Sequence, residues 1–419
     1  MNKLISMSAV ALAAAIFAPT AAHAASGTIK GTWVNYQNQG NYCDPAGRNC
    51  TGSRYLKSEY NVLHPISDTK VYVKDQNGAV IGTGVTDANG AFSIVWNRAS
   101  TPSFVRVYWQ FEHKDDRFKI RADGGGVLAK WTWEIAVTNG GVTNVGTIAA
   151  GNASAISGLA NIYDGADRMW NDSLRFSGLM LSRFTGLTIR AYSDRCPTAC
   201  ANSGENMIWM PEGSQFRPQA RILHEMGHIA AGKAAGARMD PGSYCYPSQF
   251  IPGEDEDCPN AATNGWSMTS TEWRGVALKE GMATVLGDIA LYWNNAVDPR
   301  SCLSAGECPA SSSTESSVAC TGQVGRSAMQ MVRYLWDHYD ARVDGNDDIQ
   351  KPYYVFVDTL NAIPSGTSWG QLSSYSNGSG GVDSWDSFHS WEWRNAVLNH
   401  WSGATETEDI YFQNCMGVF

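Results

Sequence analysis

The chain lacks any long hydrophobic run after its first residues, and it is short of positive charge. Its 419 residues include 31 Lys and Arg against 40 Asp and Glu, which gives a formal charge of −9. A net negative charge argues against a nucleic-acid partner, and without a long apolar run there is no candidate transmembrane helix. No internal repeat is visible either. We therefore expect neither a nucleic-acid partner nor a membrane-spanning segment.

The one apolar run that is present lies at the N-terminus. A basic start at Lys3 is followed by the apolar residues 4–18, and Ala22-His-Ala24 is an A-x-A cleavage motif. This order of features is typical of a secretory signal peptide, here cleaved after Ala24. We expect the mature chain to be secreted or periplasmic, and removal of the single positive charge of Lys3 changes its formal charge from −9 to −10.

The cysteines all lie after the predicted cleavage site. Their number, ten, is even, and in an exported protein this favours disulfides over cysteine-bound metal, because the compartment oxidises thiols. Spacing suggests local pairs, and the remaining cysteines allow alternative pairings between which the sequence does not choose. The expected local pairs are Cys43–Cys50, Cys196–Cys200 and Cys245–Cys258, and the open set is Cys302, Cys308, Cys320 and Cys415.

The composition of the chain changes near residue 150. After the signal peptide the chain is too long for one ordinary core. Residues 25–150 have the alternation and the Asn-Gly turns of β-strands and hairpins, whereas residues 151–419 are richer in helix-forming segments. The expected strands are 69–74, 79–86, 91–96, 104–111 and 129–137.

The turns between these strands carry a resemblance. Asp75-Gln-Asn-Gly78 and Asp87-Ala-Asn-Gly90 each separate alternating strands, and over roughly residues 60–97 the pattern resembles the transthyretin-like or carboxypeptidase-regulatory-like β-sandwich. The resemblance implies that the N-terminal part is an all-β sandwich of one or more modules. Such a module would position the protein or bind a surface or a glycan.

Residues 151–419 have the mixture of elements of an α+β domain. Helical periodicity or capping signals predict helices at 161–170, 218–235, 269–293, 327–342 and 391–401, and short strands are expected at 187–192 and 206–210. The other features are a capping box at 269–272, a disulfide-pinned loop at 295–325 and a Gly/Ser-rich loop at 373–381. The strand 206–210 is expected at the edge of the sheet, where it could pair with an extended peptide. An ordinary sheet edge explains it equally well.

The pentapeptide His224-Glu-Met-Gly-His228 lies in the middle of the helix expected at 218–235. On an α-helix this H-E-x-x-H spacing brings both imidazoles to one face, one turn apart, where they can bind one zinc ion. Glu225 between them can act as a base toward water at the open metal position. The plainer alternative is a pair of partly buried helix histidines without a ligand.

A catalytic zinc ion needs a third protein ligand. The metzincin pattern requires Gly at 231 and His at 234, where this chain has Ala231 and Ala234. Asp240 matches the aspzincin pattern only loosely. Glu280 is the better candidate, because a carboxylate among small residues in mid-helix is costly to bury without a cation. An exposed helix acid is the alternative.

The H-E-x-x-H motif followed by an E-G-x-A motif at Glu280 resembles the gluzincin zinc metallopeptidases over roughly residues 155–345. The resemblance implies a zincin-like α+β catalytic domain in which His224, His228 and Glu280 bind one zinc ion. It further implies that Glu225 is the general base and acid in the hydrolysis of a protein or peptide substrate.

Around the expected zinc ion the chain departs from one close family of gluzincins. Thr284 stands where the close relatives of thermolysin have aspartate. Asp288 could orient a ligand histidine, although a solvated helix residue is the favoured interpretation. In gluzincins a downstream His or Tyr stabilises the oxyanion, and the candidates for this role are His338, Tyr339 and Tyr292.

Other ligands and functions fit the sequence less well. The acidic run Glu-Asp-Glu-Asp at 254–257 could bind Ca²⁺ through oxygen ligands, but its spacing matches no calcium loop and a solvated acidic loop is favoured.

One rival function is a secreted surface-binding or carbohydrate-binding protein with a structural zinc site, and another is a zinc hydrolase of substrates other than peptides. A structural zinc site has no use for Glu225, so the sequence favours the peptidase.

Overall fold

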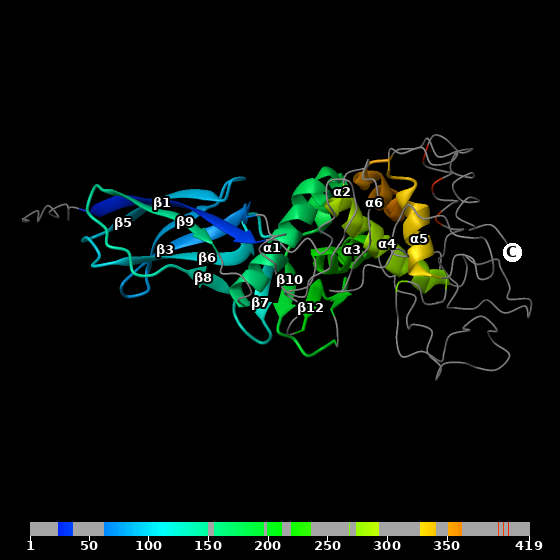
Figure 1. Cartoon of the computed structure of the whole chain (residues 1–419), viewed down its shortest axis with the longest axis horizontal. Coiled ribbons are helices and arrows are strands. Elements are labelled where there is room, and N and C mark those ends of the chain that lie inside the picture. The colour runs from blue at the N-terminus through cyan, green and yellow to red at the C-terminus, as the bar shows by residue number, and fades with distance from the viewer. Residues whose placement is uncertain are drawn as a thin grey trace, which may run out of the picture.

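In a computed structural model the chain is a mixed α/β protein with large β-sheets and, in the part of the chain described, six α-helices. The structure describes residues 24–36, 63–149, 155–196, 199–211, 219–235, 268, 274–292, 327–340, 351–362, 393, 397 and 401. Most strands lie toward one end of the molecule and the helices toward the other (Figure 1).

A four-stranded sheet is built around β1 (Ala25–Tyr36). β2 (Leu63–Pro65) and β5 (Ala91–Arg98) pair antiparallel with β1, and β9 (Val142–Ala149) pairs parallel with it. Residues 25–34 of β1 are therefore paired along most of their length with strands from three later parts of the chain.

An eight-stranded sheet runs in the order β11-β12-β10-β7-β6-β3-β4, with β8 beside β6. Its strands are β3 (Thr69–Asp75), β4 (Val80–Val85), β6 (Val105–His113), β7 (Phe118–Ala122), β8 (Ala129–Trp131), β10 (Leu187–Ala191), β11 (Cys200–Asn202) and β12 (Met207–Met210). β7, β10 and β12 are parallel, whereas β11 is antiparallel to β12 and ends the sheet.

Aromatic side chains fill the space between the two sheets. Trp33 of β1 contacts Trp109 of β6 with ring centroids 5.4 Å apart, and Phe92 of β5 contacts Trp109 at 5.6 Å. All three side chains are buried. Buried and partly exposed residues alternate along β3 and β6, as the period-two pattern of the sequence predicted.

The two D-x-N-G turns form as predicted. The carboxylates of Asp75 and Asp87 each accept hydrogen bonds from the backbone N–H groups two and four residues further on, at 2.8 and 2.9 Å. Gly78 and Gly90 have φ angles of +80° and +69°. Glycine adopts this left-handed conformation without the steric cost of a Cβ, so the Asp and the Gly together fix each turn.

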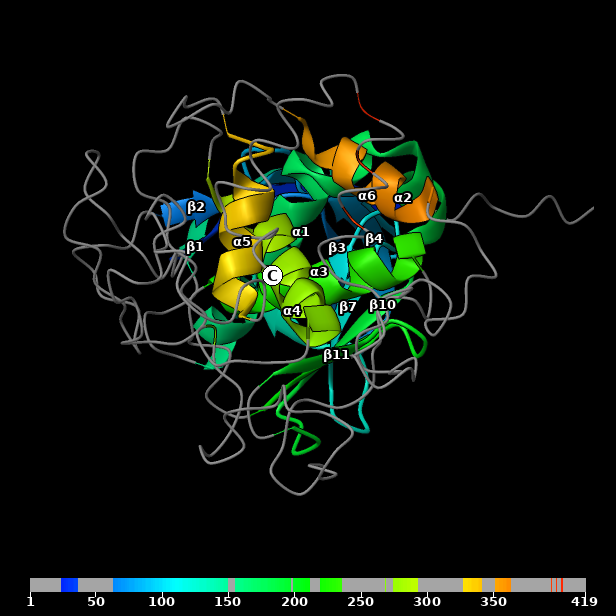
Figure 2. The same ribbon diagram turned by 90° about the vertical axis from the view of Figure 1, so that its right-hand side faces the viewer.

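The helices lie on one side of β7, β10 and β11 (Figure 2). They are α1 (Ala155–Asp172), α2 (Gly178–Arg183), α3 (Gln219–Ala235), α4 (Arg274–Leu291), α5 (Ala328–Trp336) and α6 (Tyr353–Ala362), with one 3-10 turn, η1, at Leu174–Phe176. α3 is buried on almost all sides and lies against α1, α4 and β11. A capping box starts α5, in which Ser327 and Gln330 bond reciprocally.

Predicted strands and helices in the described residues are confirmed, with shifted ends. The helix predicted at 161–170 is the longer α1, and the strand predicted at 129–137 is the shorter β8. β8 ends early because the regular ladder with β6 stops at Trp131, and only an isolated bridge between Val105 and Ile135 follows.

The prediction that the strand at 206–210 forms the edge of the sheet is wrong. β12 lies between β10 and β11, and β11 is the last strand. A turn at 203–206 folds β11 back against β12. The predicted Cys196–Cys200 disulfide is present and ties the start of β11 to residue 196.

The large sheet passes across the boundary predicted at residue 150. β7 comes from the N-terminal part and pairs in parallel along its whole length with β10 from the C-terminal part. β7 also pairs with the end of β6. The division into residues 25–150 and 151–419 stays a prediction, and a cut there would divide a hydrogen-bonded sheet.

Some predicted features lie outside the described residues. They are the signal peptide up to residue 23, the Cys43–Cys50 and Cys245–Cys258 pairs, Cys302, Cys308, Cys320 and Cys415, Asp240, the acidic run 254–257, the capping box 269–272, and the loops 295–325 and 373–381. Of the helix predicted at 391–401, Trp393 and Val397 are helical and buried. Within the described residues, no helix has the length and apolarity needed to cross a bilayer.

Candidate metal centre

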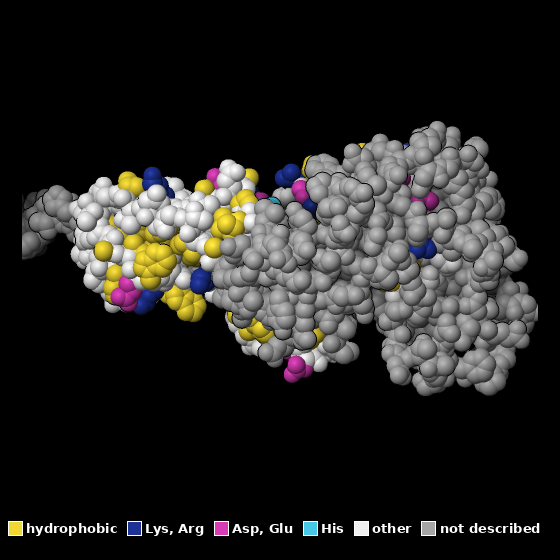
Figure 3. All heavy atoms as spheres, in the orientation of Figure 1, with side chains coloured by type: hydrophobic (Ala, Val, Ile, Leu, Met, Phe, Trp, Pro, Cys, Tyr) yellow, Lys and Arg dark blue, Asp and Glu magenta, His cyan; other side chains and the backbone are white. Residues whose placement is uncertain are grey.

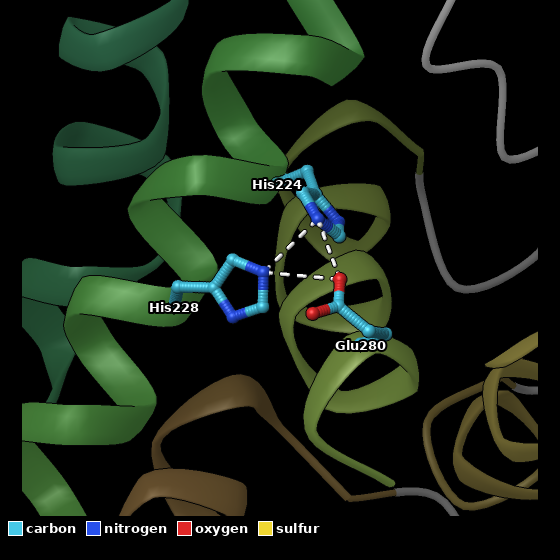
Figure 4. Close-up of side chains that lie close together, drawn as sticks. All are labelled: His224, His228 and Glu280. Carbon is cyan, nitrogen blue, oxygen red and sulfur yellow. Dashed lines mark hydrogen bonds and ion pairs between the residues drawn. The ribbon is translucent and has the colours of Figure 1, made fainter. Parts of the chain in front are cut away.

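Two helices bring the three predicted metal ligands together. His224 and His228 lie one turn apart on α3, and Glu280 projects toward them from α4 (Figure 4). The two Nε2 atoms are 3.1 Å apart, and Glu280 Oε2 is 3.2 Å from each of them. Side chains that are 52 positions apart in the sequence thus offer their ligand atoms to one point.

The triangle of ligand atoms has the size that a tetrahedral metal ion requires. Atoms that bind zinc at roughly 2.0–2.1 Å lie roughly 3.3 Å from one another at tetrahedral angles. The side chains of His224 and Glu280 are 3% and 2% exposed, whereas that of His228 is 13% exposed. The three residues therefore form a largely buried group that could hold a metal ion, with more solvent contact on the His228 side.

A threonine fixes the proton position on His224. Thr284 Oγ1 lies 2.8 Å from the Glu280 carbonyl oxygen and 2.8 Å from His224 Nδ1. The hydroxyl has one hydrogen, which it donates to the carbonyl, so it accepts the Nδ1–H of the imidazole. In the neutral ring, Nε2 then carries a lone pair directed at the other two ligand atoms. This is the tautomer that a metal ion needs.

The two histidines favour the ionised form of the Glu280 carboxylate. Burial by itself would raise the pKa of Glu280, but His228 and His224 hold that pKa well below its ordinary value. Burial lowers the pKa of His224. An ionised carboxylate beside a neutral imidazole is the protonation state in which both groups can bind a cation.

Glu225 lies beside the group and is not one of its converging ligand atoms. Its carboxylate is buried, and burial raises its pKa. Arg221, one turn earlier on α3, places its Nη1 atom 4.0 Å from Glu225 Oε1. Sequence reasoning missed Arg221, although its position four residues before Glu225 puts it on the same helix face.

The residues after Glu280 on α4 differ from expectation in two ways. In the sequence, Thr284 was notable only as a departure from a family pattern. In the structure, its hydroxyl accepts the Nδ1–H of His224. Its position four residues after Glu280 was the available signal, because that spacing places both on one helix face. The expectation that Asp288 is solvated is wrong, since this residue is 1% exposed.

The structure does not bring His338 to the ligand group. Its Nδ1 donates to the Tyr334 carbonyl oxygen at 2.8 Å, and its ring packs edge-on against Tyr334 and Trp401. The residue is fully buried, and burial lowers its pKa to about 4. His338 is therefore a neutral core histidine.

Tyr292 and Tyr339 meet each other at the far end of α4. The Tyr339 hydroxyl donates to the Tyr292 carbonyl oxygen at 3.4 Å. Tyr292 follows Glu280 by twelve residues, which along a helix is a distance of about 18 Å. Neither tyrosine is one of the converging ligand residues, and the role of Tyr292, Tyr339 or His338 as oxyanion donor stays a prediction.

A second cluster of possible ligands has the opposite histidine tautomer. His113 Nε2 lies 3.6 Å from Asp167 Oδ1 and 4.0 Å from Asp68 Oδ2. However, the Asp115 N–H donates to His113 Nδ1 at 3.1 Å, so in the neutral ring Nε2 carries the hydrogen and has no lone pair for a metal ion. Burial lowers the pKa of His113 to about 4. This cluster joins α1 to β6 and the loop before β3 and does not have the chemistry of a metal site.

Comparisons with known proteins add no family. No protein-family model matches the chain, and no curated protein sequence does. A crystal structure of a 9R-lipoxygenase from Cyanothece PCC8801 is similar at 13% identity with a TM-score of 0.18, and the alignment covers 56% of this chain and 25% of the lipoxygenase. At that TM-score the likeness carries no argument about fold or function.

Proposed function

We propose that the chain is a secreted zinc metallopeptidase. The observation that carries the proposal is the buried triangle of His224 Nε2, His228 Nε2 and Glu280 Oε2, with sides of 3.1–3.2 Å. Two imidazoles and one carboxylate, with a fourth position left open, are a ligand set of catalytic zinc. Glu225 adds a second carboxylate that the ligand set does not use.

His224, His228 and Glu280 would hold the zinc ion, which would supply a Lewis acid for the scissile carbonyl and for the attacking water. Glu225 takes the proton of the attacking water and passes it to the leaving amine. Its burial raises its pKa, which makes it a stronger base. Arg221, at 4.0 Å, favours the ionised form that accepts a proton.

The arrangement around the site supports a zincin-like α+β domain. A mixed sheet with an antiparallel last strand packs beside the motif helix, since β11 contacts α3. We place the extended peptide substrate along β11, because an edge strand offers backbone groups for pairing. The two facing sheets that include β1 and β3 support an N-terminal β-sandwich that positions the enzyme.

The test compares zinc content and cleavage of denatured casein between the wild type and three variants. Glu225→Ala should keep zinc and lose cleavage, and Glu280→Ala should lose both. The control is Glu134→Ala, which removes a carboxylate whose side chain is 55% exposed, away from the site, and should change neither quantity. A Glu225→Ala protein that cleaves casein at the wild-type rate contradicts the proposal.

The alternatives give different results in the same assay. A surface-binding or carbohydrate-binding protein with structural zinc would contain zinc and leave casein intact. Glu225→Ala would change neither of these two results. A zinc hydrolase of other substrates would leave casein intact but lose hydrolysis of an ester substrate when Glu225 is replaced. The buried, non-ligand position of Glu225 favours the peptidase over the structural site.

A further inference from the structure

A row of aromatic side chains crosses the outer face of the eight-stranded sheet. Tyr72 of β3 is paired with Tyr108 of β6, and Tyr108 is paired with Trp131 of β8. Residues paired across antiparallel strands project to the same face, so these rings lie side by side. In Figure 3 hydrophobic side chains are seen at the end of the molecule that holds β3, β6 and β8.

Two tryptophans at the end of this row are largely exposed. Trp131 is 56% exposed and Trp133 is 65% exposed. Thr132 between them is buried, because its N–H donates to the Val107 carbonyl oxygen at 2.9 Å and its hydroxyl accepts from the Val107 N–H at 3.0 Å. This anchoring turns both indoles outward. Large exposed aromatic groups that lie together are typical of interaction sites.

The aromatic row is held in one arrangement by its neighbours. The rings of Tyr108 and Trp131 are 5.9 Å apart between centroids, with an angle of 29° between their planes. Lys74 places its ammonium group 4.4 Å from the centroid of the Tyr108 ring. A platform that is already ordered loses little side-chain entropy when a ligand binds.

The cations beside the aromatic row have partners within the same face. The ion pairs are Lys70 with Glu112 at 3.1 Å, Lys70 with Asp116 at 2.5 Å, and Arg106 with Glu134 at 2.6 Å. Lys74 lies on the Tyr108 ring. Nucleic acids and anionic lipids are bound by cations that replace their counterions. An aromatic row whose neighbouring cations are already engaged is complementary to an uncharged partner.

We propose that Trp131, Trp133, Tyr108 and Tyr72 form a binding site for a neutral polysaccharide. A pyranose ring has an apolar face of C–H groups, which stacks on an aromatic ring, and a rim of hydroxyl groups. Gln110, two residues from Tyr108 on the same face of β6, supplies an amide that can hydrogen-bond to that rim. This site is independent of the metal centre, because its residues belong to β3, β6, β8 and the residues directly after β8.

Affinity electrophoresis of the full chain tests the proposal. The probes are hydroxyethylcellulose, xylan and galactomannan, each cast into a native gel. At least one should retard the wild type, and Trp131→Ala and Trp133→Ala should each raise the apparent Kd about tenfold or more. The control is Phe176→Ala, which removes an aromatic ring that is 58% exposed on η1 and should leave retardation unchanged. Equal melting temperatures show that the variants are folded.

The other possible occupants of this face give outcomes that overturn the proposal. No retardation by any of the three polysaccharides overturns it, and so does retardation that the two tryptophan variants leave unchanged. Binding to heparin or to phosphatidylserine vesicles that Trp131→Ala abolishes assigns the face to an anionic partner. A dimer in light scattering that Trp131→Ala dissociates assigns the face to a second copy of the chain.

Discussion

A single hydrogen bond at Nδ1 distinguishes His224 from His113 as a possible metal ligand. His224 donates from Nδ1 to Thr284 and directs the lone pair of Nε2 at Glu280 and His228. His113 accepts at Nδ1 from a backbone N–H and directs an Nε2–H at two carboxylates. Both side chains are buried beside acidic groups, so composition alone does not separate them. The two histidines differ in their tautomer, which the hydrogen-bond partner of Nδ1 selects.

Replacement of Thr284 tests this account at the residue scale. Thr284→Val keeps the shape of the side chain but removes the oxygen that accepts the His224 Nδ1–H at 2.8 Å. Zinc affinity should fall by about 10-fold to 100-fold, the usual effect of losing an outer hydrogen bond to a ligand histidine. Competition with a fluorescent zinc chelator measures this affinity. Thr284→Ser, which retains the hydroxyl, is the matched control, and a wild-type affinity in Thr284→Val would contradict the account.

His338 makes a different contribution, to stability at acid pH. Its pKa is lowered to about 4 by burial from an ordinary value of 6.5. Between these values the unfolded chain binds more protons than the folded one, so stability falls as the pH is lowered from 6.5 to 4. The loss attributable to this residue is at most about 3 kcal/mol, by the energy equivalent of a pKa shift.

Urea unfolding of the wild type and His338→Phe between pH 7 and pH 4 measures this effect. The phenyl ring can occupy the space against Tyr334 and Trp401 and does not titrate. The difference in unfolding free energy between the two proteins should therefore shift in favour of the variant as the pH falls. A difference that is constant with pH would show that His338 does not titrate with unfolding.

At the scale of elements, the metal centre depends on how closely α3 and α4 approach. Glycines lie at the contact: a Cβ on Gly227 would run into the Ala283 carbonyl oxygen, and one on Gly287 would crowd the backbone of Leu223. The approach sets the 3.2 Å separation between Glu280 Oε2 and the two histidine nitrogens. Gly227 therefore has a packing role inside the H-E-x-x-H motif.

Gly227→Ala should separate the two helices. The added methyl group should lower stability by roughly 1–3 kcal/mol, as overpacking does, and should weaken zinc binding because Glu280 moves away from the histidines. Thermal unfolding and chelator competition measure the two effects. The control is Gly178→Ala at the start of α2, where a Cβ meets no atom within 4 Å. Unchanged zinc affinity in Gly227→Ala would show that the ligand geometry does not depend on this contact.

Local sequence signals predicted where helices and strands form better than they predicted which elements lie beside one another. The H-E-x-x-H spacing placed His224 and His228 on one helix face because helical periodicity is a local property. The edge position of the strand at 206–210 was wrong because it depends on whether residues 200–202 fold back beside it. The choice of Glu280 as the third ligand rested on a motif, and the close packing of α3 on α4 supplies the physical reason for it.

At the scale of the molecule, the two parts of the chain share a sheet. The alternating pattern of the sequence predicted β6 as a strand of the N-terminal part. No pattern in residues 118–122 predicted that β7 would pair in parallel with β10. Such a pairing joins residues that are 69 positions apart, for example Phe118 and Leu187, and no local pattern encodes it. The composition change near residue 150 therefore does not mark a separation of the hydrogen-bonded structure.

A fragment of residues 151–419 tests how far the C-terminal part is independent. It lacks β7, so β10 loses its parallel partner on one side and keeps only β12. We expect the fragment to be unfolded or aggregated and to bind zinc poorly, whereas residues 25–419 bind it. Circular dichroism and zinc content measure the difference. A folded fragment with the full zinc content would show that β7 is dispensable and that residue 150 is a true domain boundary.

The measurement that tests the central claim most directly is a zinc titration of metal-free protein with casein cleavage as the readout. Wild-type activity should rise with added zinc and saturate at about one ion per chain, as expected for a single catalytic site. Glu225→Ala should bind the same amount of zinc and show no cleavage throughout the titration. Cleavage that is independent of zinc, or equal in the wild type and Glu225→Ala, would contradict the assignment of His224, His228, Glu280 and Glu225 as the active site of a zinc peptidase.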